Sequence, residues 1–429
     1  MTSKTIIFGA CLASTAFVVA PATAQDKPSG EITVWGWNIA AEALEHIVPA
    51  FNEQYPDVKV TVQNMGHADL HDRALAGCAA GGVDLPDVVL VENSEAELYW
   101  QRFPECFSDM GELGYDDYKD KFPAFKQTEL NYDGTAYAMP WDTGPVMVFY
   151  RRDLYEQAGI DPAAIETWDD FIAAGKKLDE ATDGKVKMAA IEKGGNDDWF
   201  RMLAIQNDCF YYGDDGETVT VNQPGCVEAL ETVKKIWDAG ILATGGWDQT
   251  IQFFKADAIA SVVSGGWYEG TVRSSAPDQE GKWGVYNMPA FKEGGQRLSN
   301  SGGSSLAIPA SSDNLDAAWA YVTFALGTPE GQIGMMKYRG LPVSLLPALD
   351  DPFIHEPQPY WGGQKVWEDM LSDIKDIPVY RSTPYYWDGR SVMIVAMNDY
   401  LDGKYDSAQA ALDAVAEQIS SATGLPIQE

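Results

Sequence analysis

The stretch "EITVWGWNIAAEALEHIVPAFNEQYPDVKVTVQ", residues 31–63, contains two strand-like segments separated by a helical one. The first segment, "EITVWGW", is short and apolar, and "VKVTVQ" has the same character. Between them, apolar residues from Leu44 to Phe51 recur at the spacing of one helix face, and Pro56 follows. The spacing predicts one helix over 40–55 between two strands.

The alternation continues beyond this stretch. A helical segment, "LHDRALAGCAAGG", is followed by the apolar strand "PDVVLVE". This order indicates an α/β fold with a mainly parallel sheet and helices on both faces. Ligands of such sheets bind at the carboxyl ends of the strands. We therefore expect binding residues after the first and third strands: Trp37, Asn38, Glu92 and Asn93.

The segment "YAMPWDTGPVMVFYRRDLYEQAGID", residues 137–161, is typical of a crossing between two lobes. Pro140 and the pair Gly144 and Pro145 interrupt regular structure around polar residues, and a buried strand, "VMVFY", follows. So short and stiff a connection predicts a hinge. Further on, Thr167 is placed to cap a helix over "WDDFIAAGKKLDE".

The first residues predict an export signal. Lys4 precedes an apolar run, and "PATA" before Gln25 is typical of a cleavage site, so we expect cleavage after Ala24 and a periplasmic protein. Lipoprotein processing at Cys11 is the alternative. Loss of residues 1–24 removes one lysine and no acid, which changes the formal charge from −34 to −35. Such an acidic protein repels nucleic acid, and we expect no nucleic-acid partner.

Four cysteines remain after signal cleavage, and an oxidising compartment permits disulfides between them. Three pairings are possible. We favour the local one, Cys78 with Cys106 and Cys209 with Cys226, because each bond closes a modest loop, and each is expected to stabilise the fold by about 3 kcal/mol.

No metal site is predicted. No two cysteines have CxxC spacing, and the four histidines form no recognisable ligand set. His67 and His71 stand four residues apart and are interpreted as solvated surface residues.

The stretch "VVSGGWYEG", residues 262–270, places two aromatic rings and a carboxylate between glycines after a strand-like run. A simple turn would need only small polar residues. The pattern favours a flat, polar ligand on Trp267, and the alternative is that Trp267 packs in the core beneath a turn.

Taken in order, these motifs resemble those of a known family. "ITVWGW", "FNEQYPDVKV", "LPDVVLVE", the crossing segment, "AIASVVSGGWYEG" and "SSLAIPASSDNLDAAWAYVTFALGTPEGQ" are similar to the extracellular solute-binding proteins of carbohydrate ABC transporters, of the maltose-binding type. The resemblance covers nearly the whole mature chain.

The resemblance implies a type II periplasmic-binding-protein fold, with two α/β lobes that close on a ligand by hinge motion. The first lobe would comprise residues 25–142 and 299–342, and the second residues 143–298 and 343–429. It also implies a monomer that binds a sugar without a cofactor, catalyses no reaction, and delivers the sugar to the permease subunits of an ABC importer.

The family's ligand contacts can be transferred where residues match. Trp267 matches a tryptophan that stacks on a sugar ring, with Tyr268 and Glu269 beside it. The apolar face of a pyranose fits an indole, and its hydroxyls can donate to a carboxylate. Further positions nominated in this way are Trp141, Asp142, Asn196, Asp197, Trp199, Ser304, Arg339, Tyr360, Trp361, Tyr386, Trp387 and Arg390.

Two other functions fit parts of this pattern. A secreted glycosidase would use a pair of carboxylates, for which Glu92 and Glu269 are available. A binding protein for another solute, such as a polyol or polyamine, is the second alternative, since aromatic rings with carboxylates also bind ammonium groups. The residues after the first and third strands depart from the maltose-type pattern, so maltose itself is not implied.

Overall fold

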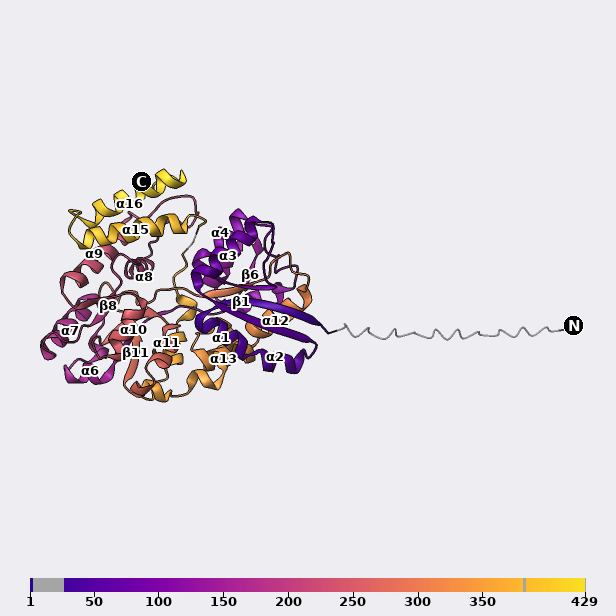
Figure 1. Cartoon of the computed structure of the whole chain (residues 1–429), viewed down its shortest axis with the longest axis horizontal. Helices are drawn as coiled ribbons and strands as arrows, with labels where there is room; N and C mark the ends of the chain where they lie inside the picture. Colours follow the sequence, from indigo (N-terminus) through magenta and orange to yellow (C-terminus); the bar gives the residue numbers. More distant parts are fainter. Residues whose placement is uncertain (3–26, 381–382, 429) are drawn as a thin grey trace.

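The computed structural model describes residues 1–2, 27–380 and 383–428, so residues 3–24 of the predicted export signal lie outside the described residues. Figure 1 shows two bodies side by side. One, coloured indigo to purple, also contains the orange helix α12 (Leu315–Gly327); the other is coloured magenta to red and ends with the yellow helices α15 (Tyr386–Leu401) and α16 (Ala408–Thr423). We call them the first and second lobes.

The first lobe is built on a five-stranded sheet in the order β2-β1-β3-β12-β6. β1 pairs in parallel with both β2 and β3, whereas β12 pairs antiparallel with β3 and β6. The strand bounds are β1 Gly30–Trp37, β2 Val58–Met65, β3 Val88–Glu92, β6 Ala138–Pro140 and β12 Ser304–Ala307, with a small hairpin of β4 Asn131–Tyr132 and β5 Thr135–Ala136. The chain therefore returns to this sheet after building much of the second lobe.

The predicted helix over 40–55 is divided in two. α1 (Asn38–His46) and α2 (Val48–Gln54) meet at Ile47. Pro49 lies in the first turn of α2, where its missing N–H needs no helical partner, so one continuous helix is replaced by two. The other helices of this lobe are α3 His67–Ala79, α4 Asn93–Arg102, α5 Ala124–Leu130 and α13 Pro329–Arg339.

The second lobe differs from the predicted mainly parallel sheet. β10 (Ser261–Gly265) and β11 (Trp283–Asn287) both pair antiparallel with the central strand β7 (Val146–Arg151). β8 (Ala189–Ile191) and β9 (Leu242–Thr244) form a separate parallel pair. Periodicity alone predicts strands but not their direction, because both pairings bury the same apolar side chains.

The helices of the second lobe include the one predicted from its cap. Thr167 Oγ1 accepts a hydrogen bond from the backbone N–H of Asp170, and the Asp170 carboxylate accepts one from the backbone N–H of Thr167. This capping box confirms the predicted start of α7 (Trp168–Ala181). The other helices are α6 Arg152–Gln157, α8 Asp198–Gln206, α9 Pro224–Asp238, α10 Trp247–Lys255, α11 Tyr268–Ser275, α14 Val366–Leu371, α15 and α16.

The lobes are connected by segments that pair with one another. Residues 141–145 lie between residues 299–304 and 341–344, with backbone hydrogen bonds from Thr143 N to Pro342 O (3.0 Å) and from Ser301 N to Gly144 O (2.8 Å). A Cβ on Gly144 would lie 2.0 Å from the carbonyl oxygen of Ser301, so glycine is required where these segments touch. This arrangement suits the predicted hinge, and the residue limits of the two lobes stay a prediction.

Both predicted disulfides are present. Cys78 is bonded to Cys106 in the first lobe, and Cys209 to Cys226 in the second. Neither bond ties one lobe to the other. No helix in the described ranges combines the length and apolar character needed to cross a membrane.

Candidate binding site

A cavity of about 510 Å³ lies between the lobes, beside the segments that connect them. The first lobe contributes Trp37 and Asn38 at the end of β1, with His67 and Glu92. The second lobe contributes Trp267, and residues 302–304 line the connecting side. Its volume falls within the ~300–1,000 Å³ range of small-ligand pockets, so it is the candidate binding site.

Trp267 is fixed on the second-lobe wall of this cavity. It immediately precedes α11, is half-buried, and donates a hydrogen bond from its indole Nε1 to the carbonyl oxygen of Ser301 (2.7 Å). A Cβ on Gly265 would lie only 2.4 Å from that nitrogen. The glycine therefore gives the ring room to lie against a connecting segment while it also lines the cavity.

A second tryptophan extends this surface. Trp247, the first residue of α10, is 47% exposed, and its ring stacks on Trp267 with centroids 5.9 Å apart and an interplanar angle of 22°. Sequence reasoning missed Trp247, although "GGW" at 245–247 repeats the "GGW" at 265–267. Two indoles this close leave no space for a ligand between them, so together they form one aromatic unit that lines the cavity, the indole platform.

The same two rings line a smaller space of about 100 Å³. Asn196 and Trp199 lie there with Glu192 and Asp198, and the Asn196 amide donates to the Glu192 carboxylate (2.9 Å). The indole pair therefore borders both the larger and the smaller chamber.

The first-lobe wall carries an ion pair. His67 Nε2 lies 2.9 Å from Glu92 Oε2, and the Trp37 ring packs edge-on against the imidazole with centroids 4.8 Å apart. Burial alone would lower the pKa of His67, but the hydrogen bond to Glu92 and the charges of Glu92 and Glu95 raise it to about 9. Burial alone would raise the pKa of Glu92, but His67 lowers it to about 2. Both groups are charged at neutral pH.

The interpretation of His67 and His71 as solvated surface residues is therefore wrong. Their side chains are 33% and 13% exposed, and His71 Nδ1 lies 2.8 Å from the buried carboxylate of Glu95. The histidines project from one face of α3, and the acids come from the end of β3 and the first turn of α4. The first-lobe fold brings these elements together.

The connecting side of the cavity is held by Asp142 and Ser304. Asp142 Oδ1 accepts hydrogen bonds from the backbone N–H of Ser304 (2.7 Å) and from its hydroxyl (2.5 Å). Both side chains are buried, yet both line the cavity. Behind them, the ammonium group of Lys126 is fully enclosed.

Comparison with known proteins places this geometry in a family. The model of the family "Bacterial extracellular solute-binding protein" matches residues 36–332, which is more than half of the chain. The chain belongs to this family. Membership in a solute-binding family counts against the glycosidase alternative, as does the separation of Glu92 and Glu269, which line different cavities.

Two relatives within the solute-binding proteins cover most of the chain. The lactose-binding protein of Rhizobium radiobacter is 30% identical over 359 residues, which span 82% of this chain and 83% of that protein. The arabinooligosaccharide-binding protein of Bacillus subtilis (strain 168) is 26% identical, and the match covers 98% of this chain and 99% of that protein.

Solved structures of solute-binding proteins share the fold. A binding protein from B. animalis subsp. lactis Bl-04, in complex with β-1,6-galactobiose, has a TM-score of 0.78 and 24% identity, covering 94% of this chain and 100% of that one. The GacH receptor of Streptomyces glaucescens has a TM-score of 0.77 and 20% identity, covering 92% and 98%. These likenesses confirm the predicted two-lobed α/β fold.

Several residues nominated from the sequence lie away from the cleft of this solute-binding protein. Asn93 is buried inside the first lobe, where its amide donates to Glu129 and accepts from the Ser305 hydroxyl (2.7 Å). Trp141 is fully buried in the core. Arg339 forms an ion pair with Glu42 (2.5 Å) at the end of α13.

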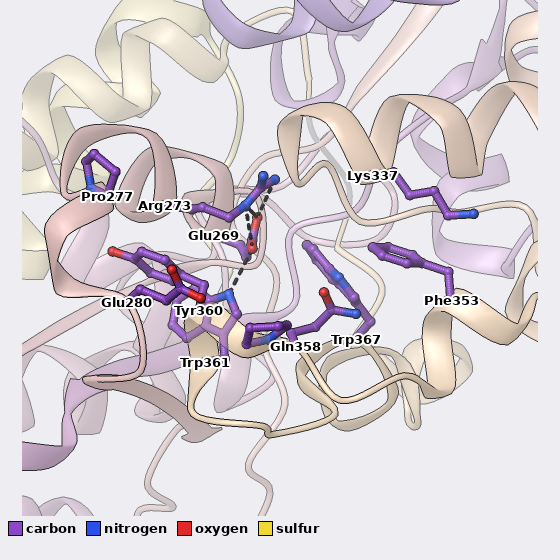
Figure 2. A pocket seen from close by; sticks show the side chains of 11 residues that line it. Glu269, Arg273, Pro277, Glu280, Lys337, Phe353, Gln358, Tyr360, Trp361 and Trp367 are labelled. Atoms are coloured by element: carbon purple, nitrogen blue, oxygen red, sulfur yellow. Dashed lines mark hydrogen bonds and ion pairs between the residues drawn. The ribbon is translucent and has the colours of Figure 1, made fainter.

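Glu269 faces a different pocket, of about 350 Å³ (Figure 2). Its buried carboxylate accepts hydrogen bonds from the indole Nε1 of Trp361 (2.8 Å) and from Arg273 Nε (3.1 Å). Tyr360 lines the same pocket and donates to the carbonyl oxygen of Ala276 (2.8 Å). Tyr268, although adjacent in sequence, is buried and lies with Trp267 along the smaller chamber.

A largely buried hydrogen-bonded network beside α8 contains three residues nominated from the sequence: Asp197, Tyr386 and Arg390. Asp197 is fully buried and accepts hydrogen bonds from the Tyr211 hydroxyl and from Arg390 Nε (3.1 Å). The Tyr386 hydroxyl accepts one from Arg201 Nη1 (2.5 Å). Trp387 is 39% exposed, lies under the Arg390 guanidinium at 4.9 Å, and has its ring 6.2 Å from that of His71 in the other lobe.

The exposed position of Trp247 leads to a testable prediction. Trp247→Ala is expected to leave the melting temperature nearly unchanged and to weaken sugar binding about fivefold, or ~1 kcal/mol, because half of the platform is lost. Calorimetric titration of both proteins measures the change. Trp237→Ala is the matched control, since this half-buried indole lies on α9 beside Lys193. Equal affinities in all three proteins would contradict a role for Trp247.

Proposed function

We propose that the protein binds a di- or oligosaccharide between its two lobes and delivers it to the permease subunits of an ABC importer. The paired indoles of Trp247 and Trp267, opposite the ion pair of His67 and Glu92, are the observation that carries this proposal. Relatives named for lactose and arabinooligosaccharide binding support the same class of ligand.

The chemistry of the cavity suits a neutral, polyhydroxylated ring. An apolar C–H face of the sugar can lie on the indole platform, where burial of flat aromatic surface is favourable. On the first-lobe wall, the Glu92 carboxylate can accept hydrogen bonds from sugar hydroxyls, and the Asn38 amide can both donate and accept. A second sugar unit would extend past the indoles towards Asn196, which favours a ligand longer than one ring.

Ligand binding is proposed to draw the lobes together about the paired connecting segments. Sugar contacts come from both lobes, so a closed form makes more of them than an open one, and the ligand shifts the population towards closure. The predicted limits, 25–142 with 299–342 and 143–298 with 343–429, are the proposed rigid bodies. The protein is proposed to act as a monomer.

The main alternative to a sugar ligand is a cation such as a polyamine. Aromatic rings and carboxylates attract ammonium groups. In this cavity, however, Glu92 already pairs with His67, and Asp142 accepts two hydrogen bonds from Ser304. With these partners neither carboxylate offers an unpaired negative charge to an ammonium group beside the indoles, which favours a neutral organic ligand on the platform.

A thermal-shift panel tests the function. Neutral di- and trisaccharides are expected to raise the melting temperature, because a ligand that binds only the folded state stabilises it by mass action. Monosaccharides, mannitol and spermidine are run beside them, and the incubated sugars are checked for cleavage. If spermidine alone raised the melting temperature, the ligand would be a cation and not a sugar. Hydrolysis of the incubated sugars would support the glycosidase alternative.

The site of action is proposed to be the periplasm, reached after signal cleavage. Mass spectrometry of the exported protein is expected to give a chain that begins at Gln25 and lacks four hydrogens relative to the reduced form, since the four cysteines form two disulfides. A chain that begins at Cys11 with an attached lipid would instead establish lipoprotein processing.

A further inference from the structure

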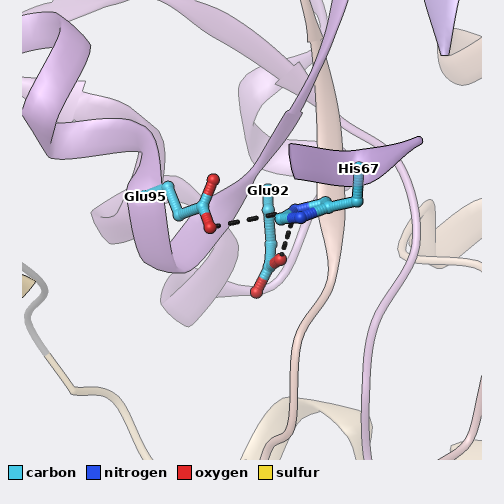
Figure 3. Close-up of side chains that lie close together, drawn as sticks. All are labelled: His67, Glu92 and Glu95. Atoms are coloured by element: carbon cyan, nitrogen blue, oxygen red, sulfur yellow. Dashed lines mark ion pairs between the residues drawn. The ribbon is translucent and has the colours of Figure 1, made fainter. Parts of the chain in front are cut away.

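Four side chains of the first lobe converge on one wall of the cleft. His67 and His71 project from α3 one helical turn apart, Glu92 ends β3, and Glu95 lies in the first turn of α4. In Figure 3 the contacts from Glu92 and Glu95 meet at the same imidazole nitrogen of His67. Of the four, only His67 and Glu92 line the cavity, so the proposed sugar site does not account for Glu95 and His71.

The distances between these atoms fit a bound cation. His67 Nε2 lies 2.9 Å from Glu92 Oε2 and 3.8 Å from Glu95 Oε1, and one ligand atom from each of the three residues lies within 4.8 Å of the other two. Ligand atoms around a tetrahedral Zn²⁺ with bonds of ~2.1 Å are separated by roughly 3.4 Å. Small side-chain adjustments, together with release of the His67 Nε2 proton as the ion binds, would therefore complete three bonds to one ion.

His71 supplies the support that such a site needs. Its Nδ1 lies 2.8 Å from Glu95 Oε2, while the other oxygen of that carboxylate faces His67. The Tyr99 hydroxyl also lies 2.9 Å from this nitrogen. The Glu95 side chain is only 3% exposed, so its orientation is fixed by packing as well as by His71. Hydrogen-bonded partners of this kind hold a metal-ligating carboxylate in place.

We propose that His67, Glu92 and Glu95 form a binding site for a divalent transition metal of the Zn²⁺ class, with His71 as a positioning residue. One imidazole and two carboxylates are donors that Zn²⁺ accepts, whereas Ca²⁺ and Mg²⁺ prefer oxygen ligands alone. Since His67 and Glu92 also line the cavity, an ion held by them would lie at the wall of the cleft. The proposal does not depend on sugar binding.

Zinc titration of the full mature chain tests this site. The protein is made without a polyhistidine tag, stripped with a chelator, dialysed, and titrated with Zn²⁺ in a calorimeter at pH 7 without sugar. One ion per chain is expected. His67→Ala and Glu95→Gln should each weaken binding by at least tenfold, and His71→Ala by about tenfold because it only orients Glu95.

His46→Ala is the matched control, because this exposed histidine stacks on Tyr338 and is expected to leave zinc affinity unchanged. Circular dichroism melts establish that each variant is folded. If His67→Ala does not fold, Glu92→Gln is used in its place, because the Glu92 side chain is 25% exposed. Absence of saturable binding, equal weakening by His46→Ala, or equal affinity for Ca²⁺ would overturn the proposal. Sugar affinity is measured in a separate titration, so failure of the zinc proposal can be distinguished from failure of the proposed function.

Discussion

Lys126→Met is expected to destabilise the protein by about 3–5 kcal/mol at pH 7, the usual cost of removing one partner from a buried ion pair. Lys126 lies on α5 with its side chain fully buried, 3.6 Å from Glu129 Oε2 and 3.4 Å from the carbonyl oxygen of Ser304. Asp142 is the second buried acid that interacts electrostatically with Lys126. Methionine fills a similar volume, so the loss measures charge rather than packing.

The destabilisation caused by Lys126→Met should depend on pH. Burial raises the pKa of both Glu129 and Asp142, and Lys126 opposes that rise. Without the lysine, both pKa values rise further. When the pKa of a carboxyl group is higher in the folded state than in the unfolded state, the protein loses stability as pH rises through that folded-state pKa. Lys126→Met should therefore destabilise the protein less at pH 5 than at pH 7.

Urea unfolding followed by circular dichroism at both pH values measures this difference. Lys59→Met is the control, because the ion pair of Lys59 with Glu31 is 67% and 76% exposed and contributes little. A loss below ~1 kcal/mol, or one that is the same at both pH values, would mean that the buried acids are already protonated.

Local features of the fold were predictable because their causes are local. The cap at Thr167 requires only residues 167–170, and the disulfides join cysteines 28 and 17 residues apart. The break between α1 and α2 was within reach as well, since Pro49 stands inside the predicted helix. The direction of β10 and β11 was not, because it depends on how the chain returns from distant segments.

The site was predictable only where side chains follow strands whose ends meet. Trp37, Asn38 and Glu92 lie on the cavity for this reason, and Asp142 and Ser304 lie where connecting segments touch. Other residues were expected at the cavity only because they are adjacent in sequence to a site residue, and this expectation was wrong for some of them. Glu269 comes two residues after Trp267, yet the turn into α11 directs its carboxylate to Trp361 and a different pocket. The acidic partners of His67 and His71 lie on β3 and α4, and no local sequence pattern places these elements beside α3.

Trp267→Ala is expected to weaken sugar binding about thirtyfold, which corresponds to roughly 2 kcal/mol, and to leave most of the stability intact. The ring is half-buried, lines both chambers of the cleft, and makes one hydrogen bond, to Ser301 O. Truncation therefore removes contact surface for the ligand at the centre of the site. It opens space into an existing cavity rather than a void in the core.

Titration calorimetry and thermal melts of the same variants separate the two roles of this ring. Trp267→Phe keeps an aromatic surface and loses the indole N–H, so it should recover most of the affinity if stacking dominates. If Trp267 were a core residue, alanine would cost ~3–5 kcal/mol of stability and leave the affinity of the folded protein unchanged. A variant that melts far earlier but binds sugar normally would therefore remove Trp267 from the site, and with it the platform of two stacked indoles.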